Sequence, residues 1–581
     1  MKLSKNAEIP ESENSSTKKN NIFNPQVKPL EDRQVMDVGI ELLRERNHSL
    51  LWREYCSFID LSLEKFMQIQ KQLLLQQIAK LQSSELGRSI MGGVTPKNVE
   101  EFRQQVPLTT YNNYAQYLLK RREDILPSPP IFWGHTSGRT GEYDYKWCPI
   151  TSGQWGEIEK LTFAAFCFCS CKERGEVNIN LRDKILYGAA PAPYVTGLLA
   201  RYAFSRIFDF LPPLDEAESI SFQERGKKGI TMAIAEGLDF YSALPSVIVN
   251  VGERLGDGGI KNLKPLMRQP RALARILPAV IKSKMAHRRM LPKDIWKVKG
   301  LISSGSDASV YSEKISAMWG RRPLDMFACT EGLVISLQTW DYKGLTFYPY
   351  LNFLEFIPEQ DCLRAREDRT FKPRTLLLDE VTAGQNYQLV ITNFHGGPFI
   401  RYVVGDMIKI TARRNENLNI DIPQMVYHSR IDDMIDIAGF TRLTESVIWK
   451  ALENSGVDYQ DWTARKELKD TPILHLYLEP RANNQLKPEQ IANLVHEALI
   501  KLDKPYSELE AFLGLKPLIV TLVTPGAFDH YMRQQLATGV ELGRMKVSHI
   551  NPSDKVLESL LSYSSAVSVQ KETRPIHVSS H

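Results

Sequence analysis

Short apolar runs rich in β-branched residues alternate with helical segments along most of this 581-residue chain, and this alternation is the strongest constraint on its fold. The runs typical of strands are KILYGAA (184–190), SALPSVIVNV (242–251), GLISSGS (300–306), YQLVITN (387–393) and FIRYVVGDMIKIT (399–411). Helical periodicity is found between them, at 152–169 and 308–319. The alternation predicts an α/β fold in which helices flank mixed sheets.

The length predicts at least two domains, because a single core rarely extends over so many residues. We expect a large N-terminal domain over 33–429 and a smaller α+β domain over 430–560. Segments 1–32 and 561–581 are polar and poor in core-forming residues, which predicts disordered tails. Between Val35 and Leu86 the periodicity predicts a helical lead-in that ends at Gly87.

Charge and cysteine content exclude several classes of protein. The net charge is only +5 and the isoelectric point is about 8.6, which is too mild to indicate nucleic acid as the main partner. Seven cysteines without framework spacing favour a reducing, cytoplasmic location. The N-terminus lacks the apolar core of a signal peptide, and no apolar run reaches the roughly 18 residues of a membrane span. We therefore expect a soluble protein, and a monomer.

Two local patterns allow more than one interpretation. Cys167, Cys169 and Cys171 alternate within an apolar helical run, which lacks the spacing of a metal site and favours buried packing. The stretch 264–299 is strongly basic, with Ile and Leu between its charges. A solvated helical face is the plain reading, and a surface for an acidic partner, lipid headgroups or the phosphates of CoA is the alternative.

Residues 135–147, HTSGRTGEYDYKW, combine small residues, hydroxyls and a lysine in a run with almost no aliphatic side chains. Such a loop can turn successive N–H groups toward one point and bind a polyphosphate, to which Lys146 would add a positive charge. The spacing differs from that of a Walker loop, because no Lys-Ser/Thr pair follows the glycines at the required offset. Taken alone, the run is more typical of a plain hairpin turn rich in turn-forming residues.

Three later stretches carry side chains suited to the rest of a nucleotide. Thr330 and Glu331 in MFACTEG (326–332) stand at a strand end, where they can hold a Mg²⁺ ion on nucleotide phosphates. Asp406 in IRYVVGDMIKI (400–410) can accept hydrogen bonds from ribose hydroxyls. Arg430 lies in HSRIDDMIDIAGF (428–440), at the expected domain boundary. The plain alternatives are a solvated loop for MFACTEG, a tight hairpin for IRYVVGDMIKI and a polar linker for HSRIDDMIDIAGF.

These four stretches, in this order, resemble the adenylate-forming superfamily of acyl-CoA synthetases, adenylation domains and luciferases. Within it, HTSGRTG, YGAAPAPYVTG (187–197), LISSGSDASVYSEKI (301–315) and FIRYVVGD are most similar to the auxin-responsive-promoter family of acyl-acid amido synthetases. The resemblance covers roughly residues 35–550 and implies ATP and Mg²⁺ as cofactors. Arg139 replaces a usual hydroxyl residue, and Lys146 falls two positions later than in the short form of the loop.

The resemblance implies a role for each matching position. Those assigned to the nucleotide are Thr136, Ser137, Gly138, Thr140, Gly141 and Lys146 for the phosphates, Ser304, Gly305 and Phe327 for adenine, Thr330 for the α-phosphate, Asp406 for the ribose and Arg430 for support from the hinge. Those assigned to the metal, the hinge and the acid are Glu331 for Mg²⁺, Asp432 for rotation of a mobile small domain, Lys546 for bridging acyl and phosphate oxygens, and Tyr194, Val195 and Thr196 for the wall of the acid site.

The implied activity is an ATP-dependent ligase that forms an acyl-adenylate and passes the acyl group to an amine, most simply an amino acid. Transfer to the thiol of CoA is the first alternative, which the basic stretch 264–299 supports. An inactive binding protein on the same fold is the second, which Arg139 in the phosphate loop supports. Residues 191–197 can also be a turn stiffened by proline rather than a wall of the acid site.

Overall fold

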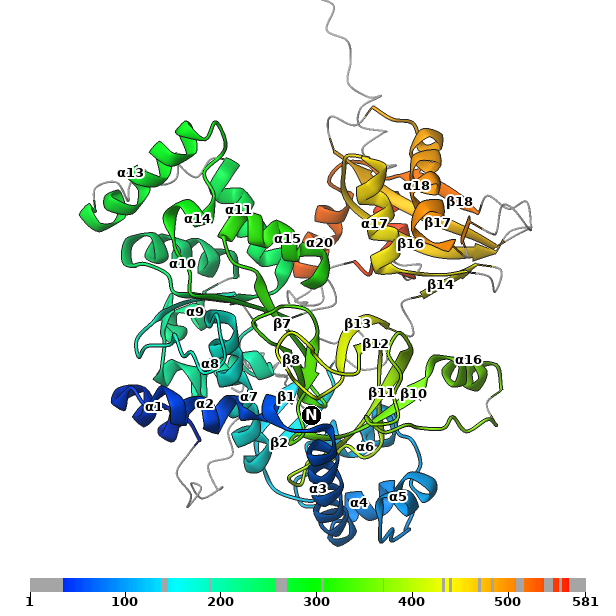
Figure 1. Ribbon diagram of the computed structural model, residues 1–581. Coiled ribbons are helices and arrows are strands. Elements are labelled where there is room, and N and C mark those ends of the chain that lie inside the picture. The colour runs from blue at the N-terminus through cyan, green and yellow to red at the C-terminus, as the bar shows by residue number, and fades with distance from the viewer. Residues whose placement is uncertain are drawn as a thin grey trace, which may run out of the picture.

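The computed structural model describes residues 35–136, 145–188, 190–220, 222–257, 269–304, 308–368, 370–430, 434–437, 441–468, 472–481, 485–504, 506–507, 517–537, 547–552 and 556–563. They form an eleven-stranded sheet flanked by helices, a separate hairpin, and a smaller C-terminal part with a three-stranded and a two-stranded sheet (Figure 1). This arrangement confirms the predicted α/β fold with a smaller C-terminal domain. The first predicted tail, 1–32, and residues 564–581 of the second, 561–581, lie outside the described residues.

The lead-in is a series of separate helices rather than one continuous helix. It begins with α1 (Val35–Glu45), α2 (His48–Cys56), α3 (Leu63–Ser83) and α4 (Glu85–Ile90). The predicted stop at Gly87 is wrong, because α3 already ends at Ser83 and Gly87 lies within α4. A β-carbon at Gly87 would lie 2.2 Å from the carbonyl oxygen of Leu81. The glycine is therefore required where α4 packs against the end of α3, not as a helix terminator.

The large sheet joins a parallel half to an antiparallel half. The parallel strands are β3 (Lys184–Gly188), β4 (Asp209–Leu211), β5 (Phe240–Ala243), β6 (Gly300–Ser304) and β7 (Pro323–Cys329). The antiparallel strands are β8 (Leu333–Gln338), β9 (Leu345–Phe347), β10 (Asn352–Pro358), β11 (Asn386–Asn393), β12 (Tyr402–Ala412) and β13 (Gln424–Arg430). The order across the sheet is β10-β11-β12-β13-β9-β8-β7-β6-β5-β3-β4. The hairpin of β1 (Pro130–His135) and β2 (Trp147–Thr151) is separate.

Helices cover both faces of the parallel half, so alternate residues of one strand enter different cores. Phe240 packs into one hydrophobic cluster with α7 (Ser152–Ser170). Its neighbour Tyr241 packs into a second cluster with α11 (Pro245–Asp257) and α15 (Ala308–Trp319). Because both faces of these strands are buried, their sequences are continuous apolar runs. The helices between α4 and the last strand of the sheet are α5 (Val99–Gln105), α6 (Ala115–Leu118), α7 (Ser152–Ser170), α8 (Val195–Tyr202), α9 (Leu214–Ser219), α10 (Phe222–Glu236), α11 (Pro245–Asp257), α13 (Pro270–Met285), α14 (Pro292–Ile295), α15 (Ala308–Trp319) and α16 (Glu359–Glu367).

The run SALPSVIVNV is only partly a strand, which corrects the sequence prediction. Strand β5 ends at Ala243, and α11 begins at Pro245. Proline is well suited to the first turn of a helix, because it lacks the N–H group that would have no partner there. Val249 and Ile248 are buried on α11 in the second cluster, so tertiary packing overrides the β-propensity of this valine-rich run.

The cysteines of α7 confirm the packing interpretation. Cys167, Cys169 and Cys171 are all buried and free. A β-carbon at Gly300 of β6 would lie 2.2 Å from the Sγ of Cys169, so α7 and β6 touch closely at this point. Burial raises the pKa of the Cys169 thiol well above its usual range and disfavours the reactive thiolate.

The C-terminal part has its own core. Its elements are β14 (Met434–Ile437), β15 (Thr441–Thr444), α17 (Glu445–Ser455), β16 (Tyr459–Leu468), β17 (Pro472–Pro480), α18 (Pro488–Leu502), β18 (Leu518–Leu522) and α20 (Ala527–Ala537). One face of the sheet β16-β17-β18 packs with α17 and α18 around Trp462 and Leu476. Residues 556–563 are also helical, and the ring of Tyr563 stacks 4.5 Å from that of His530. The last helix thus runs three residues into the segment that the sequence assigned to the tail.

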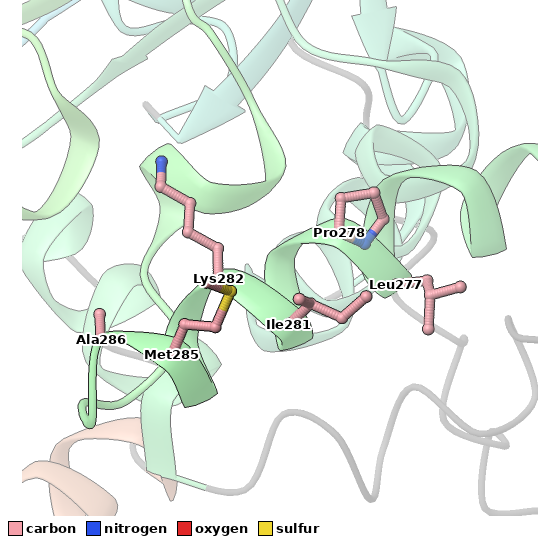
Figure 2. Close-up of a pocket in the computed structure, with 6 residues that line it drawn as sticks. All are labelled: Leu277, Pro278, Ile281, Lys282, Met285 and Ala286. Carbon is pink, nitrogen blue, oxygen red and sulfur yellow. The ribbon is translucent and has the colours of Figure 1, made fainter.

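Helix α13 lies outermost on one side of the large domain (Figure 1), and Figure 2 shows side chains on its outward face. Its inner face is buried through Ala272, Ile276, Ala279 and Ser283. Among the described residues, no helix is long and apolar enough to cross a bilayer.

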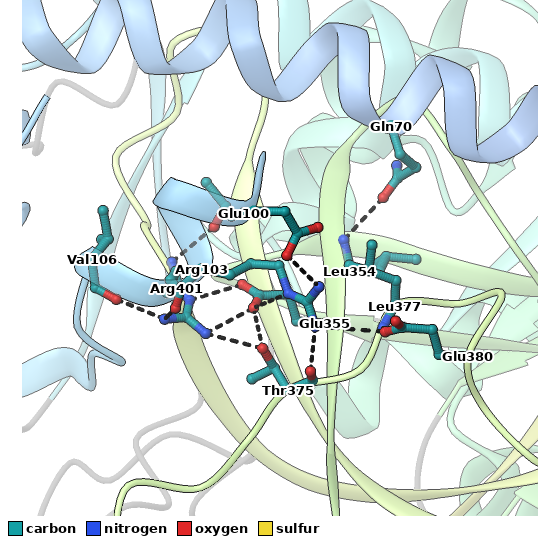
Figure 3. Close-up of polar contacts among 11 residues, drawn as sticks. Gln70, Glu100, Arg103, Val106, Leu354, Glu355, Thr375, Leu377, Glu380 and Arg401 are labelled. Atoms are coloured by element: carbon teal, nitrogen blue, oxygen red, sulfur yellow. Dashed lines mark hydrogen bonds and ion pairs between the residues drawn. The ribbon is translucent and has the colours of Figure 1, made fainter. Parts of the chain in front are cut away.

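A buried ion pair joins the lead-in helices to the antiparallel half of the sheet (Figure 3). The guanidinium of Arg401 donates to both carboxylate oxygens of Glu355 on β10, at 3.0 and 2.8 Å. It also donates to the carbonyl oxygens of Arg103 and Val106 at the end of α5, each at 2.6 Å. Thr375 Oγ1 donates to Glu355 at 2.6 Å and accepts from Arg401 at 3.1 Å. Both charges are therefore compensated inside the protein, as burial requires.

We expect Glu355→Gln to lower the free energy of unfolding by about 3–5 kcal/mol, because it leaves the Arg401 charge buried without a counter-charge. Denaturant unfolding of the large domain measures this change. Glu173→Gln, at an exposed position, is the control and should change stability by no more than about 0.5 kcal/mol. Equal effects of the two substitutions would contradict a stabilising role for the pair.

Candidate active site

The hairpin β1–β2 brings the two ends of the 137–144 loop together. Thr136 follows β1, and Lys146 precedes β2. The backbone N–H of Thr136 donates to the Lys146 carbonyl at 3.1 Å, and the Lys146 N–H donates to the Thr136 hydroxyl at 3.3 Å. Thr136 and Lys146 are thus fixed as neighbours, although the loop between them lies outside the described residues.

The turn between β7 and β8 holds Thr330 and Glu331, as the sequence predicted for a strand end. Asn393 of β11 donates from Nδ2 to the Glu331 carbonyl at 3.0 Å. Asn352 of β10 donates to the Gly332 carbonyl at 2.7 Å and accepts from Asn393 at 2.8 Å. Two buried amides from neighbouring strands therefore fix the backbone of this turn. The interpretation as a solvated loop is wrong for Glu331, which is only 8% exposed.

The carboxylate of Glu331 has two partners from distant parts of the chain. The Tyr402 hydroxyl donates to Glu331 Oε1 at 2.7 Å, and Lys146 Nζ lies 3.7 Å from the same oxygen. Burial, followed by the neighbouring Glu331 charge, raises the pKa of Tyr402 well above its usual range, so its hydroxyl stays a donor. The structure thereby brings together Lys146 and Glu331, which the sequence assigned to one nucleotide site.

Sequence reasoning assigned no role to Tyr402. The residue stands within FIRYVVGD, but its partner Glu331 is 71 positions away, and no local pattern links the two. Tyr402 follows Arg401 directly in the chain. The buried ion pair between Arg401 and Glu355 therefore fixes the start of the strand that carries Tyr402. The amides Asn352 and Asn393 were missed for the same reason.

Two predicted adenine residues lie on adjacent strands. Ser304, at the end of β6, is the register partner of Met326 on β7, and Phe327 follows Met326. The Phe327 ring is buried and lies 6.3 Å from the ring of Tyr427 on β13, tilted by 33°. Tyr427 is thus an aromatic neighbour of Phe327 that the sequence did not reveal.

Asp406 and Arg430 are register partners on β12 and β13. The interpretation of Gly405–Asp406 as a hairpin turn is wrong, because β12 runs without a break from Tyr402 to Ala412. Gly405 has a φ of 89°, and the register between β11 and β12 shifts between Gln388 and Val390. A bulge at glycine therefore changes the direction of the Asp406 side chain within a continuous strand.

The predicted acid wall adjoins the hairpin. Tyr194 is the N-cap of α8, and Val195 and Thr196 form its first turn. The ring of Tyr194 lies 4.5 Å from that of His135, the last residue of β1, and the ring of Tyr145 lies 4.3 Å from the same histidine. The Thr196 hydroxyl donates to the Ala190 carbonyl at 3.3 Å. His135 therefore connects the predicted acid wall with the end of the phosphate loop.

Several predicted site residues lie outside the described residues: Ser137, Gly138, Thr140, Gly141, Gly305, Asp432 and Lys546. For Arg430 the structure describes the strand position but not the side chain. Within the part of the chain that is described, no group of three or more His, Cys, Asp or Glu residues is arranged to hold a metal ion.

We expect Tyr402→Phe to lower the free energy of unfolding by about 1–3 kcal/mol, because a buried carboxylate oxygen loses its donor while the aromatic ring remains. Thermal or denaturant unfolding measures the change. Tyr241→Phe, a buried tyrosine on β5, is the matched control and should have a smaller effect. A loss for Tyr402→Phe no larger than that of the control would argue against the hydrogen bond to Glu331.

The chain spans only part of each curated relative that it resembles. The indole-3-acetic acid-amido synthetase GH3.3 of Arabidopsis thaliana is 26% identical over 227 residues, which is 37% of this chain and 36% of the relative. The jasmonoyl–L-amino acid synthetase GH3.5 of Oryza sativa subsp. japonica is 25% identical over 229 residues, 36% of this chain and 38% of the relative. These matches therefore cover just over a third of either protein.

The fold is shared over nearly the whole chain. The AtGH3.15 acyl acid amido synthetase in complex with 2,4-DB superposes with a TM-score of 0.59 at 16% identity, covering 92% of this chain and 97% of that one. A 2-hydroxyisobutyryl-CoA ligase in the postadenylation state superposes with a TM-score of 0.52 at 13% identity, covering 94% and 98%. The fold is therefore the one found in adenylate-forming enzymes.

Three family models account for more than half of the residues. The GH3 family N-terminal domain matches 56–176, the central domain matches 345–430 and the C-terminal domain matches 443–555. The three matches follow the same order as the hairpin and α7, the antiparallel half of the sheet, and the C-terminal part. The chain belongs to the GH3 family.

Proposed function

We propose that this protein is an ATP-dependent ligase that activates a carboxylic acid as an acyl-adenylate and transfers the acyl group to an amino acid. The observation that carries the proposal is the buried Glu331 carboxylate, which lies in a turn fixed by two amides and 3.7 Å from Lys146. A carboxylate beside a lysine at the end of a phosphate-type loop suits a metal–polyphosphate ligand. The names of the relatives, which describe amido and amino acid synthetases, support the same reaction class.

In this proposal, each part of the nucleotide is bound by residues on strands or in the loops that connect them. Thr136 and Lys146, with Ser137, Gly138, Thr140 and Gly141, would bind the phosphates. Ser304, Gly305 and Phe327 would line the adenine site, and the positions of Ser304 and Phe327 on the adjacent strands β6 and β7 support this. Asp406 would hold the ribose hydroxyls and Thr330 the α-phosphate. Arg430 would support the nucleotide, consistent with its register position opposite Asp406.

The residues present fit a Mg²⁺ ion. Glu331 offers a single carboxylate, and Mg²⁺ in nucleotide sites is commonly held by one or two carboxylates together with substrate phosphates and water. When bound, the ion supplies charge neutralisation on the phosphate oxygens. Lys146 would exchange its contact with Glu331 for the phosphates, so the ion pair seen here would be a resting arrangement.

Two steps complete the proposed reaction. First, a carboxylate oxygen of the acid attacks the α-phosphorus of ATP, an acyl–phosphate bond forms, and the bond to pyrophosphate breaks. Next, the amino group attacks the acyl carbonyl, the bond to AMP breaks, and the nitrogen loses its proton. The first step requires orientation and charge stabilisation more than acid–base chemistry, which suits a site built from Lys146, Glu331 and loop N–H groups.

The C-terminal part would move between these steps. Asp432 would be the hinge, and Lys546 would bridge acyl and phosphate oxygens during adenylation only. The ring of Tyr311 on α15 packs 5.5 Å from that of Trp449 on α17, a small aromatic contact between the two parts. A contact of this size is compatible with rotation of one part against the other.

Tyr194, Val195 and Thr196 are the proposed wall of the acid site. The seven cysteines are all free, which supports a reducing, cytoplasmic location, and we propose that the protein acts as a monomer.

CoA is the alternative acceptor, supported by the shared fold of a CoA ligase. Product masses obtained with amino acids and with CoA separate the two acceptors.

Substrate-dependent exchange of labelled pyrophosphate into ATP tests the first step. With a panel of aromatic, aliphatic and hydroxy acids, we expect wild-type exchange with at least one acid. Glu331→Gln should lower it by about 10²–10³-fold, because the Mg²⁺ ion that would neutralise the phosphates loses its carboxylate ligand. Glu173→Gln is the control at an exposed position. Folded wild-type protein that neither exchanges pyrophosphate nor binds ATP would instead favour an inactive binding protein.

Lys546→Ala should separate the two steps. Exchange should fall by about 10²-fold or more, because this lysine is proposed to act in adenylation. Transfer from a supplied acyl-adenylate to an amino acid should remain close to wild type, as measured by product mass. Lys450→Ala, at an exposed position of α17, is the control. Equal loss in both steps would contradict the role that we assign to Lys546.

A further inference from the structure

The outward face of α13 carries a row of exposed apolar side chains. Leu277, Ile281 and Met285 are 52%, 50% and 77% exposed. With Pro278 and Ala286 they line an open hollow on the surface, beside the stem of Lys282 (Figure 2). Residues four apart lie on the same side of an α-helix, so these three form one continuous apolar stripe.

The opposite face of α13 is already committed to the body of the protein. Ile276 and Ala279 are buried in the cluster shared with α10 and α15. Arg275 donates to the carbonyl oxygens of Ile234 and Ala235, at 3.2 and 2.7 Å, and so attaches α13 to the end of α10. The helix therefore cannot turn its apolar stripe inward without breaking both the packing and these hydrogen bonds.

Cations border the stripe on both sides. Lys284 lies along one edge, and Arg271 and Lys282 lie along the other, as the 3.6-residue period requires. The helix contains no acidic residue, and the turn after it adds His287, Arg288 and Arg289. Asp294 pairs with Arg288 and lies 3.5 Å from Lys282, but Arg271 and Lys284 carry exposed charges at opposite edges.

We propose that α13 binds an anionic lipid surface, with the apolar stripe in the acyl–headgroup boundary and the bordering cations at the headgroups. An apolar centre with lysines on both margins fits such an interface, because long cationic side chains reach outward to anions while their stems cover apolar surface. A second copy of the same face is disfavoured, because it would bring the like charges of Arg271, Lys282 and Lys284 together.

Sedimentation of the full-length protein with vesicles tests this proposal. Wild type should sediment with phosphatidylcholine vesicles that contain phosphatidylserine, and should do so more weakly at high salt. Ile281→Glu with Met285→Glu should weaken binding by about tenfold or more, because both changes put negative charge into the stripe. Arg271→Gln with Lys284→Gln should weaken binding and reduce its salt dependence.

Leu75→Glu, at an exposed apolar position of α3, is the matched control and should sediment as wild type does. Unchanged thermal unfolding of each variant shows that the fold is kept. Failure of wild type to sediment, or equal binding to pure phosphatidylcholine, would overturn the proposal. Sedimentation velocity tests for a second copy as the occupant. The proposal would also be overturned if wild type were a dimer and the double substitution Ile281→Glu with Met285→Glu dissociated it.

Discussion

The buried ion pair between Arg401 and Glu355 is the interaction on which the arrangement of the site depends. It ties the end of α5 to β10 and to the residue that precedes β12, three segments far apart in the chain. Burying either charge alone would be costly, so the cluster forms only when these segments are all in place. Because Tyr402 follows Arg401, the same pair fixes the start of β12 and holds the phenol against Glu331.

Around this centre, the site is organised by buried polar groups that satisfy one another. Asn352 and Asn393 hold the backbone of the β7–β8 turn, while Tyr402 and Lys146 meet the side chain of Glu331. Each element contributes through a side chain on a strand or at a strand end, and strands hold such groups more rigidly than loops. The side chain of Glu331 and the backbone of its turn are therefore held by contacts from several strands.

Patterns in the sequence predicted the elements that depend on local chemistry. The alternating runs gave four of the five expected strands, and the helices at 152–169 and 308–319 agree with α7 and α15 within a residue. The remaining run, SALPSVIVNV, is only partly a strand, because Pro245 begins a helix. Valine side chains can pack into a core from a helix as well as from a strand. Gly87 was wrongly predicted to end a helix. The glycine is required because the backbone of Leu81 lies too close for a side chain, and the local sequence does not show this contact.

The sequence by itself determined the α/β class, the separate C-terminal part and the strand-end positions of Thr330 and Glu331, because these depend on periodicity and on turn chemistry. Only the tertiary structure decided that Glu331 meets Tyr402 and Lys146, that Asn352 and Asn393 fix its turn, and that α13 exposes an apolar stripe. Such contacts join residues tens to hundreds of positions apart. They follow from sheet order and the compensation of buried charge, which no local pattern encodes.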